Sequence, residues 1–293
     1  MKLSLDLLLE FRLWLLGFRS SKVSLEKNEL GKTETIHSHI RYFFREGSPE
    51  FRSFVVVLAH GLGASASHFG NLMIPLSKAG FTVYALDLPG HGESSIPPDG
   101  LTSDSIYQGF HQWMKQVIPN DKKVVLIGNS LGGGIALRYA VENSEQLKNL
   151  VLISPAAGFE TQSQWEEFRE TIRMKTFQDG CRYGEKIYHA PPFYSPAIGY
   201  SIWKTFNQKA IRNLIETAQV DDFFLKKPFS ENFPQTLVIW GKSEKVFHKR
   251  HLDWIRTHLP KTHVIDESEG VGHCPQIDAP EWLFNRIKKF ISI

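Results

Sequence analysis

Short apolar runs alternate with amphipathic stretches along most of this chain. Runs rich in Val, Ile and Leu, which are typical of buried strands, cover residues 54–59, 82–87, 124–129 and 149–154. Apolar residues at helical spacing fall between these runs, at 68–79, 104–118 and 131–143. Because strands that alternate with helices build a parallel sheet covered on both faces, the pattern predicts an α/β fold with a doubly wound, mostly parallel sheet.

Four further strands are expected to bring this sheet to eight. Residues 22–46 alternate in the manner of an antiparallel hairpin, with turn residues at Asn28 and Gly31. Strand-like runs at 236–240 and 262–266 follow toward the C-terminus. In such a sheet we expect the functional site at the carboxyl ends of the strands.

After the fourth buried run the strand rhythm stops, and helical, aromatic-rich sequence follows. We interpret residues 156–230 as a helical lid inserted between strands six and seven, and residues 22–155 and 231–293 as the core. Phe159, close to the exit of strand six, is expected to line the substrate pocket. The other lid aromatics are expected mainly to pack the lid's own small core: Trp165, Phe168, Phe193, Tyr194, Trp203, Phe206, Phe223 and Phe224.

The first 21 residues predict an amphipathic helix. Charged residues interrupt an apolar pattern there. The apolar side chains recur at helical spacing: Leu3, Leu7, Phe11, Trp14 and Phe18. The charges exclude a membrane-spanning helix, and they disfavour a secretory signal peptide, for which a clear small-residue cleavage site is also lacking. Two interpretations remain, a peripheral membrane contact through residues 1–20 or a helix docked on the protein itself, and Trp14 with the neighbouring arginines favours the first.

Composition narrows the classes of function. The 293 residues, 42% of them hydrophobic, suffice for the core of one α/β domain. The formal net charge of +3 is spread without a basic run, so we expect no nucleic-acid partner. Cys181 and Cys274 read as free thiols of a reducing compartment, which favours a cytoplasmic location. Histidine pairs lack a third ligand at a familiar spacing, so no metal and no cofactor are expected, and no feature defines an oligomeric state.

The sequence Gly128-Asn129-Ser130-Leu131-Gly132 follows a buried run and precedes a helical pattern. This is the G-x-S-x-G arrangement of a sharp strand-to-helix turn that exposes a nucleophilic serine. The glycines are needed where any Cβ would collide with neighbouring backbone. Ser130 is therefore the candidate nucleophile, and the N–H of Leu131 at the helix N-terminus is a candidate oxyanion donor.

A histidine and a carboxylate should follow the serine in chain order. His273 lies in a glycine-flanked loop after the last strand, which suits a general base toward Ser130. Glu244 follows the penultimate strand and is the candidate acid that orients the imidazole. The acids that compete with it are Asp266, Asp221 and Asp222.

The run at 54–59 leads into His60-Gly61-Leu62-Gly63, and the N–H of Leu62 is the expected second oxyanion donor. His60 is expected to anchor this loop rather than to act as a base. Residues 61–66, which overlap this loop, also fit G-x-G-x-x-A, with Asp87 at the spacing of a ribose-binding acid. An NAD-binding protein is thus an alternative, although it explains neither Ser130 nor His273.

Taken together, four ordered blocks resemble the α/β-hydrolase superfamily: His60-Gly61-Leu62-Gly63, Asp87-Leu88-Pro89-Gly90-His91-Gly92, Gly128-Asn129-Ser130-Leu131-Gly132-Gly133 and Gly272-His273. The resemblance covers residues 50–293, and within the superfamily it is greatest to the monoacylglycerol lipase and carboxylesterase branch. It implies a serine esterase that acts on a small-molecule acyl ester with an apolar acyl chain.

The third block and Pro155-Ala156-Ala157-Gly158 are also similar to hydrolases that split carbon-carbon bonds in aromatic ring-cleavage products. That group usually carries a tryptophan directly after the histidine. Cys274 at this position favours an ester substrate. A hydrolase-like protein that only binds a ligand is a further alternative, which the presence of every catalytic residue type disfavours.

Overall fold

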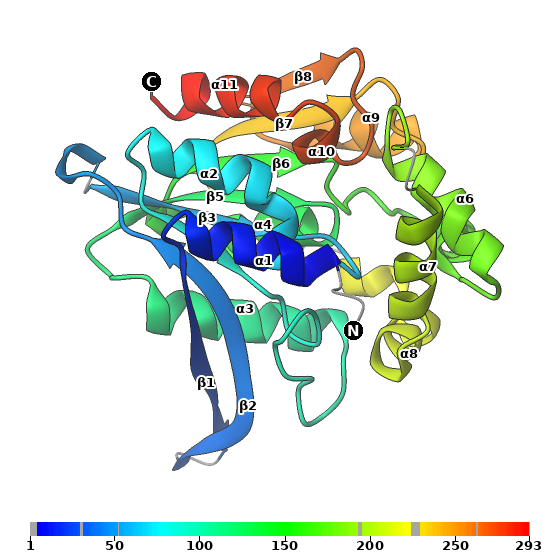
Figure 1. Ribbon diagram of the computed structural model, residues 1–293, viewed down its shortest axis with the longest axis horizontal. Helices are drawn as coiled ribbons and strands as arrows, with labels where there is room; N and C mark the ends of the chain where they lie inside the picture. The colour runs from blue at the N-terminus through cyan, green and yellow to red at the C-terminus, as the bar shows by residue number, and fades with distance from the viewer. Residues whose placement is uncertain are drawn as a thin grey trace.

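The computed structural model describes residues 5–29, 32–51, 53–192, 195–223, 229–261 and 263–292 (Figure 1). Within these ranges eight strands form one sheet: β1 (Arg19–Glu29), β2 (Lys32–Arg45), β3 (Phe54–Ala59), β4 (Val83–Leu86), β5 (Lys123–Asn129), β6 (Leu147–Ile153), β7 (Gln235–Gly241) and β8 (Val264–Ser268). Their order is β1-β2-β4-β3-β5-β6-β7-β8. The β1–β2 and β2–β4 pairs are antiparallel and all other pairs are parallel, which confirms the expected fold class.

Helices cover both faces of the sheet because its central strands are apolar on both sides. In β3, Val56 and Leu58 pack into one core and Val55 and Val57 into the other, as the two-residue period of a strand requires. The first core includes residues of α1 (Leu5–Leu15), α2 (Gly70–Lys78) and α11 (Pro280–Ile291). The second core includes residues of α3 (Ser103–Val117), α4 (Leu131–Glu142) and α9 (Lys249–His258).

The segment between β6 and β7 contains α5 (Gln162–Ile172), α6 (Phe177–Ile187), α7 (Ser195–Phe206), α8 (Lys209–Thr217) and the turn Val220–Phe223. Figure 1 shows α6, α7 and α8 gathered beyond the end of the sheet toward which the β8 arrow points. Trp165 Nε1 donates a 2.7 Å hydrogen bond to Ala218 O, which joins α5 to the end of α8. Phe206 lies against Gly63, where a Cβ would come within 2.5 Å of the ring.

Some element limits differ from those expected. Helix α1 ends at Leu15 rather than near residue 21, since Gly17 adopts a φ of 80° and β1 begins at Arg19. Asn28 pairs with Thr33 inside the hairpin instead of forming its turn. Five residues named above lie outside the described residues, Leu3, Gly31, Phe193, Tyr194 and Phe224, and so does position 262, where the last strand-like run was expected to begin. In the described ranges, no helix combines the length and apolar character that a bilayer crossing requires.

Candidate active site

Ser130 stands at the turn between β5 and α4 with φ 55° and ψ −118°, a conformation that L-residues rarely adopt. Backbone atoms crowd the turn on both sides. A Cβ on Gly128 would lie 2.2 Å from Gly132 O, and one on Gly132 would lie 2.1 Å from Ala59 O. Glycine is therefore required at both positions by close approach, and these contacts hold the strained serine in place.

This strain predicts that Ser130→Gly is more stable than Ser130→Ala. Both variants lack the hydroxyl, but only glycine adopts a φ of 55° without a Cβ clash. Relief of the strain, reduced by the larger entropy of an unfolded glycine, leaves an expected gain of about 1 kcal/mol in the free energy of unfolding. Urea unfolding of the two variants measures the difference. A glycine variant less stable than the alanine variant would contradict a strained turn.

His273 and Glu244 form a buried pair. Glu244 follows β7, and His273 lies in the loop between β8 and the short helix α10 (Pro275–Asp278). His273 Nδ1 is 2.8 Å from Glu244 Oε2, and both side chains are at most 3% exposed. The other carboxylate oxygen, Oε1, accepts hydrogen bonds from the N–H groups of Val246 at 2.7 Å and Phe247 at 3.1 Å. Each oxygen of Glu244 therefore has a fixed role, one toward the backbone and one toward the imidazole.

The surroundings of Glu244 favour its ionised form. Burial raises the pKa of this carboxyl, but the charge of His273, the hydrogen bond with its imidazole and the hydrogen bond from the Val246 N–H outweigh burial. The pKa of Glu244 is consequently lowered from its ordinary value. A carboxylate that stays charged at neutral pH can stabilise an imidazolium at Nδ1.

Two further side chains link the serine turn to the histidine loop. Asn129 Nδ2 donates to His273 O at 3.1 Å, and Gln276 Nε2 donates to Asn129 Oδ1 at 3.1 Å. Asp278 Oδ2 accepts from the Gly272 N–H at 2.8 Å on the other side of the loop. The sequence analysis missed all three. Only Asn129 carried a signal, because it is the residue directly before the candidate nucleophile.

The loop that contains Leu62 lies against Ser130. A Cβ on Gly61 would be 3.2 Å from Ser130 Cβ and 3.7 Å from Ser130 Oγ. His60 anchors this loop, as expected: its Nδ1–H donates to Gly61 O at 2.8 Å, and its Nε2 accepts from the Leu88 N–H at 3.0 Å. Burial and the charge of His91 hold the pKa of His60 well below its ordinary value, so it stays neutral in this role.

A largely apolar cavity opens at Ser130. Ten of its twelve lining side chains are apolar, and the two polar ones are serines: Leu62, Ser103, Ser130, Leu131, Ala156, Trp165, Phe168, Ile172, Leu214, Ile215, Ala218 and Phe247. Both candidate oxyanion residues are thus on the wall beside the serine. The ring of His273 packs on one residue of this wall, with its centroid 5.3 Å from that of Phe247.

Phe159 does not line this cavity, contrary to the expectation. Its side chain is 2% exposed, and its ring packs behind the aromatic residues that do form the wall. The ring centroid lies 5.4 Å from that of Trp165, 5.3 Å from Phe168 and 6.1 Å from Phe247. Trp165 and Phe168, which were expected mainly to pack the lid's own core, occupy the lining position instead.

The structure places the three competing acids in other surroundings than the imidazole of His273. Asp266 pairs with Arg286. Asp221 and Asp222 are exposed in the turn after α8. Glu244 is thus the one acid of the four for which a contact with His273 is observed among the described residues.

The interpretation of Asp87 as a ribose-binding acid was wrong, because the Asp87 carboxylate is buried and hydrogen-bonded within the protein. Its side chain is fully buried, and it accepts hydrogen bonds from the Ala66 N–H at 2.8 Å, the Glu93 N–H at 2.9 Å and Arg41 Nε at 2.7 Å. A ribose hydroxyl has no access to a carboxylate held in this way.

Comparisons with known proteins agree with this architecture. A family model described as alpha/beta hydrolase fold matches residues 55–280. The chain is 25% identical to "Lipase 1" of Psychrobacter immobilis over 81% of this chain and 77% of that protein. It is 27% identical to a 2-hydroxy-6-oxo-6-(2'-aminophenyl)hexa-2,4-dienoic acid hydrolase of Metapseudomonas resinovorans, over 92% of this chain and 96% of that protein. Among solved structures, a bacterial membrane phospholipase A aligns with a TM-score of 0.75 at 22% identity, covering 97% and 90% of the two chains.

Proposed function

This chain belongs to the α/β-hydrolase fold family, and from that premise we propose that it is a serine hydrolase that cleaves carboxylic esters with an apolar acyl group. One observation carries the proposal. The buried pair of His273 and an ionised Glu244 is linked by Asn129 to the turn of Ser130, and Ser130 lines an apolar cavity. The similarity to a lipase over most of both chains supports an ester as the substrate.

In the proposed reaction, Ser130 Oγ attacks the ester carbonyl carbon while His273 Nε2 takes the hydroxyl proton. Nε2 has this role because Glu244 occupies Nδ1. The carbonyl oxygen becomes an oxyanion, and the N–H groups of Leu62 and Leu131 are the donors we assign to it. Leu131 begins α4, so the helix dipole adds to this stabilisation.

The tetrahedral intermediate collapses when the bond to the alkoxy oxygen breaks. His273 passes its proton to that oxygen, and the alcohol leaves an acyl group on Ser130. A water molecule then attacks the acyl carbon as His273 accepts its proton. The return of that proton to Ser130 Oγ releases the carboxylic acid and restores the enzyme.

We propose that residues 156–230 act as the lid of this site. Six of the twelve lining residues come from α5, α8 and the residue that follows α8. The hydrogen bond of Trp165 to Ala218 holds these two helices together over the cavity. Acyl-chain preference is accordingly a property of this segment, while the reacting groups belong to the core.

The apolar wall predicts that activity rises with acyl-chain length. Each methylene buried in the cavity is worth about 0.8 kcal/mol, so kcat/KM should increase about fourfold per methylene until the cavity is filled. The measurement is kcat/KM for p-nitrophenyl acetate, butyrate, hexanoate and octanoate at monomeric concentrations. Equal values for acetate and octanoate would contradict an acyl-binding role for this cavity.

A carbon-carbon bond hydrolase is the second candidate, because the dienoic acid hydrolase of Metapseudomonas resinovorans is similar over almost the full length of both chains. The same assay separates the two. A 2-hydroxy-6-oxo-dienoate joins the panel, and its loss of absorbance on cleavage is followed beside ester hydrolysis. We expect the esters to be the better substrates, and a higher kcat/KM for the dienoate would reverse the assignment.

A further inference from the structure

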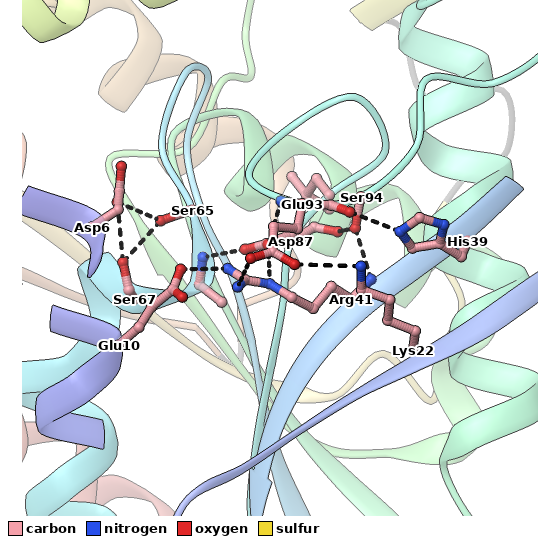
Figure 2. A network of polar contacts seen from close by, with 12 residues as sticks. Asp6, Glu10, Lys22, His39, Arg41, Ser65, Ser67, Asp87, Glu93 and Ser94 are labelled. Atoms are coloured by element: carbon pink, nitrogen blue, oxygen red, sulfur yellow. Dashed lines mark hydrogen bonds and ion pairs between the residues drawn. The ribbon is translucent and has the colours of Figure 1, made fainter. Parts of the chain in front are cut away.

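One side of α1 is fixed to the protein (Figure 2). Leu13 is 1% exposed and packs into the core. Asp6 Oδ1 accepts a 3.0 Å hydrogen bond from Ser65 Oγ, and Glu10 Oε1 accepts one of 2.7 Å from Arg41 Nη2. Because three contacts on one side hold the helix, it cannot roll to bury its other side.

The opposite side of α1 is apolar and open to solvent. Five large apolar side chains on it are each more than half exposed, and we call them the α1 strip: Leu7 (56%), Leu8 (52%), Phe11 (55%), Trp14 (66%) and Leu15 (62%). At 100° per residue these positions fall on one side of the helix. The rings of Phe11 and Trp14 stack, with centroids 5.8 Å apart. A contiguous apolar strip of this kind marks an interaction surface.

The charges of α1 favour an anionic occupant. Its two acids, Asp6 and Glu10, face the protein and have partners there. Arg12 is exposed and donates a hydrogen bond to the neutral amide oxygen of Asn71, and Arg19 just beyond the helix is exposed as well. The strip is thus bordered by two exposed guanidinium groups. Trp beside Arg is the combination that suits the headgroup level of a membrane.

The size of the strip argues against a second copy of this chain as the occupant. A stable protein interface needs about 20–30 residues on each side. The α1 strip has five large apolar residues, which is enough for a helix that lies half-immersed in an interface. We therefore propose that the α1 strip seats this protein on an anionic lipid surface.

This seat lies next to the candidate site. Ser65, which bonds to Asp6, is three residues after Leu62. Arg41, which bonds to Glu10, also bonds to Asp87, and Asp87 holds the Ala66 N–H. Figure 2 shows this chain of contacts from α1 to the loop that contains Ser65 and Ser67. If the α1 strip contacts the lipid, the loop that contains Leu62 lies on the other side of α1, which faces the protein.

The test is co-sedimentation of the full chain with vesicles of phosphatidylcholine and phosphatidylglycerol at a 3:1 ratio in 0.1 M salt. We expect the wild type to bind, and Phe11→Ser/Trp14→Ser to bind about 30-fold more weakly, since two exposed apolar side chains no longer enter the interface. The matched control is Ile96→Ser/Val264→Ser, which removes two exposed apolar side chains elsewhere. It should bind as the wild type does. Binding of the wild type to pure phosphatidylcholine should be about tenfold weaker.

Three results would overturn the inference. They are a wild type that does not sediment with the vesicles, a control that loses as much binding as the α1 variant, or an α1 variant that turns an oligomer into monomers in light scattering. Vesicle binding is measured without substrate, so it does not depend on the proposed function. Hydrolysis of soluble p-nitrophenyl butyrate by the α1 variant, expected at the wild-type rate, shows that the protein is folded.

Discussion

Ser130→Ala should lower ester turnover by about 10⁴-fold or more and abolish covalent labelling by a fluorophosphonate probe. The reason is that the acyl-enzyme route requires the Ser130 oxygen, and a triad without its nucleophile retains only the catalysis of the binding site and oxyanion donors. The alanine keeps the Cβ and the strained backbone, so the fold should persist. Initial rates with p-nitrophenyl butyrate and gel fluorescence of the labelled protein measure the two effects.

The matched control for this variant is Ser103→Ala. Ser103 is the other serine on the cavity wall, and its hydroxyl donates to Asp222 O at 3.3 Å. We expect it to keep labelling and to change kcat/KM by less than about threefold, as for a residue that only lines the pocket. Retained labelling in Ser130→Ala together with lost labelling in Ser103→Ala would show that Ser103, and not Ser130, is the nucleophile.

Glu244→Gln should lower kcat by about 10³–10⁴-fold while the protein remains folded. The two backbone N–H groups of Val246 and Phe247 hold one oxygen of the side chain, so the glutamine must keep its carbonyl oxygen there. Its NH₂ group then faces Nδ1 of His273 and donates to it. This places the imidazole proton on Nε2, in the tautomer that cannot accept a proton from Ser130.

The control for Glu244→Gln is Asp266→Asn. Asp266 was a competing candidate for the acid on sequence grounds, but its carboxylate pairs with Arg286. It should leave kcat within about twofold of the wild type. Stopped assays with p-nitrophenyl butyrate, together with thermal unfolding to confirm folding, measure both variants. An equal loss in Asp266→Asn, or a loss of less than tenfold in Glu244→Gln, would remove Glu244 from the proposed triad.

Much of the fold was predictable because it rests on local, redundant signals. The buried strands of a parallel sheet are apolar on both faces, and the runs at 54–59 and 124–129 match β3 and β5 to within one residue. The serine turn was equally predictable, since Gly128 and Gly132 are required by backbone contacts only ångströms from Ser130. In such cases the residue type itself carries the geometry.

Other features depend on contacts between segments far apart in the sequence. The choice between Glu244 and Asp266 is decided by which loop reaches His273, and nothing in either local sequence records it. Phe159 failed as a pocket residue for the same reason, because Trp165 and Phe168 from α5 cover it. The two interpretations of the N-terminal segment also proved compatible in geometry, since Leu13 docks on the core while Trp14 points outward.

The position of helices α5 to α8, between strands β6 and β7, has an evolutionary consequence. Strands β6 and β7 are neighbours in register, with Leu150 opposite Thr236 and Ile153 opposite Ile239, so the sheet fixes both ends of the insertion independently of its content. Under the proposed function, changes in this segment would therefore alter which acyl groups bind without changing Ser130, His273 or Glu244. Proteins that share this sheet could in this way differ in substrate range through the inserted segment alone.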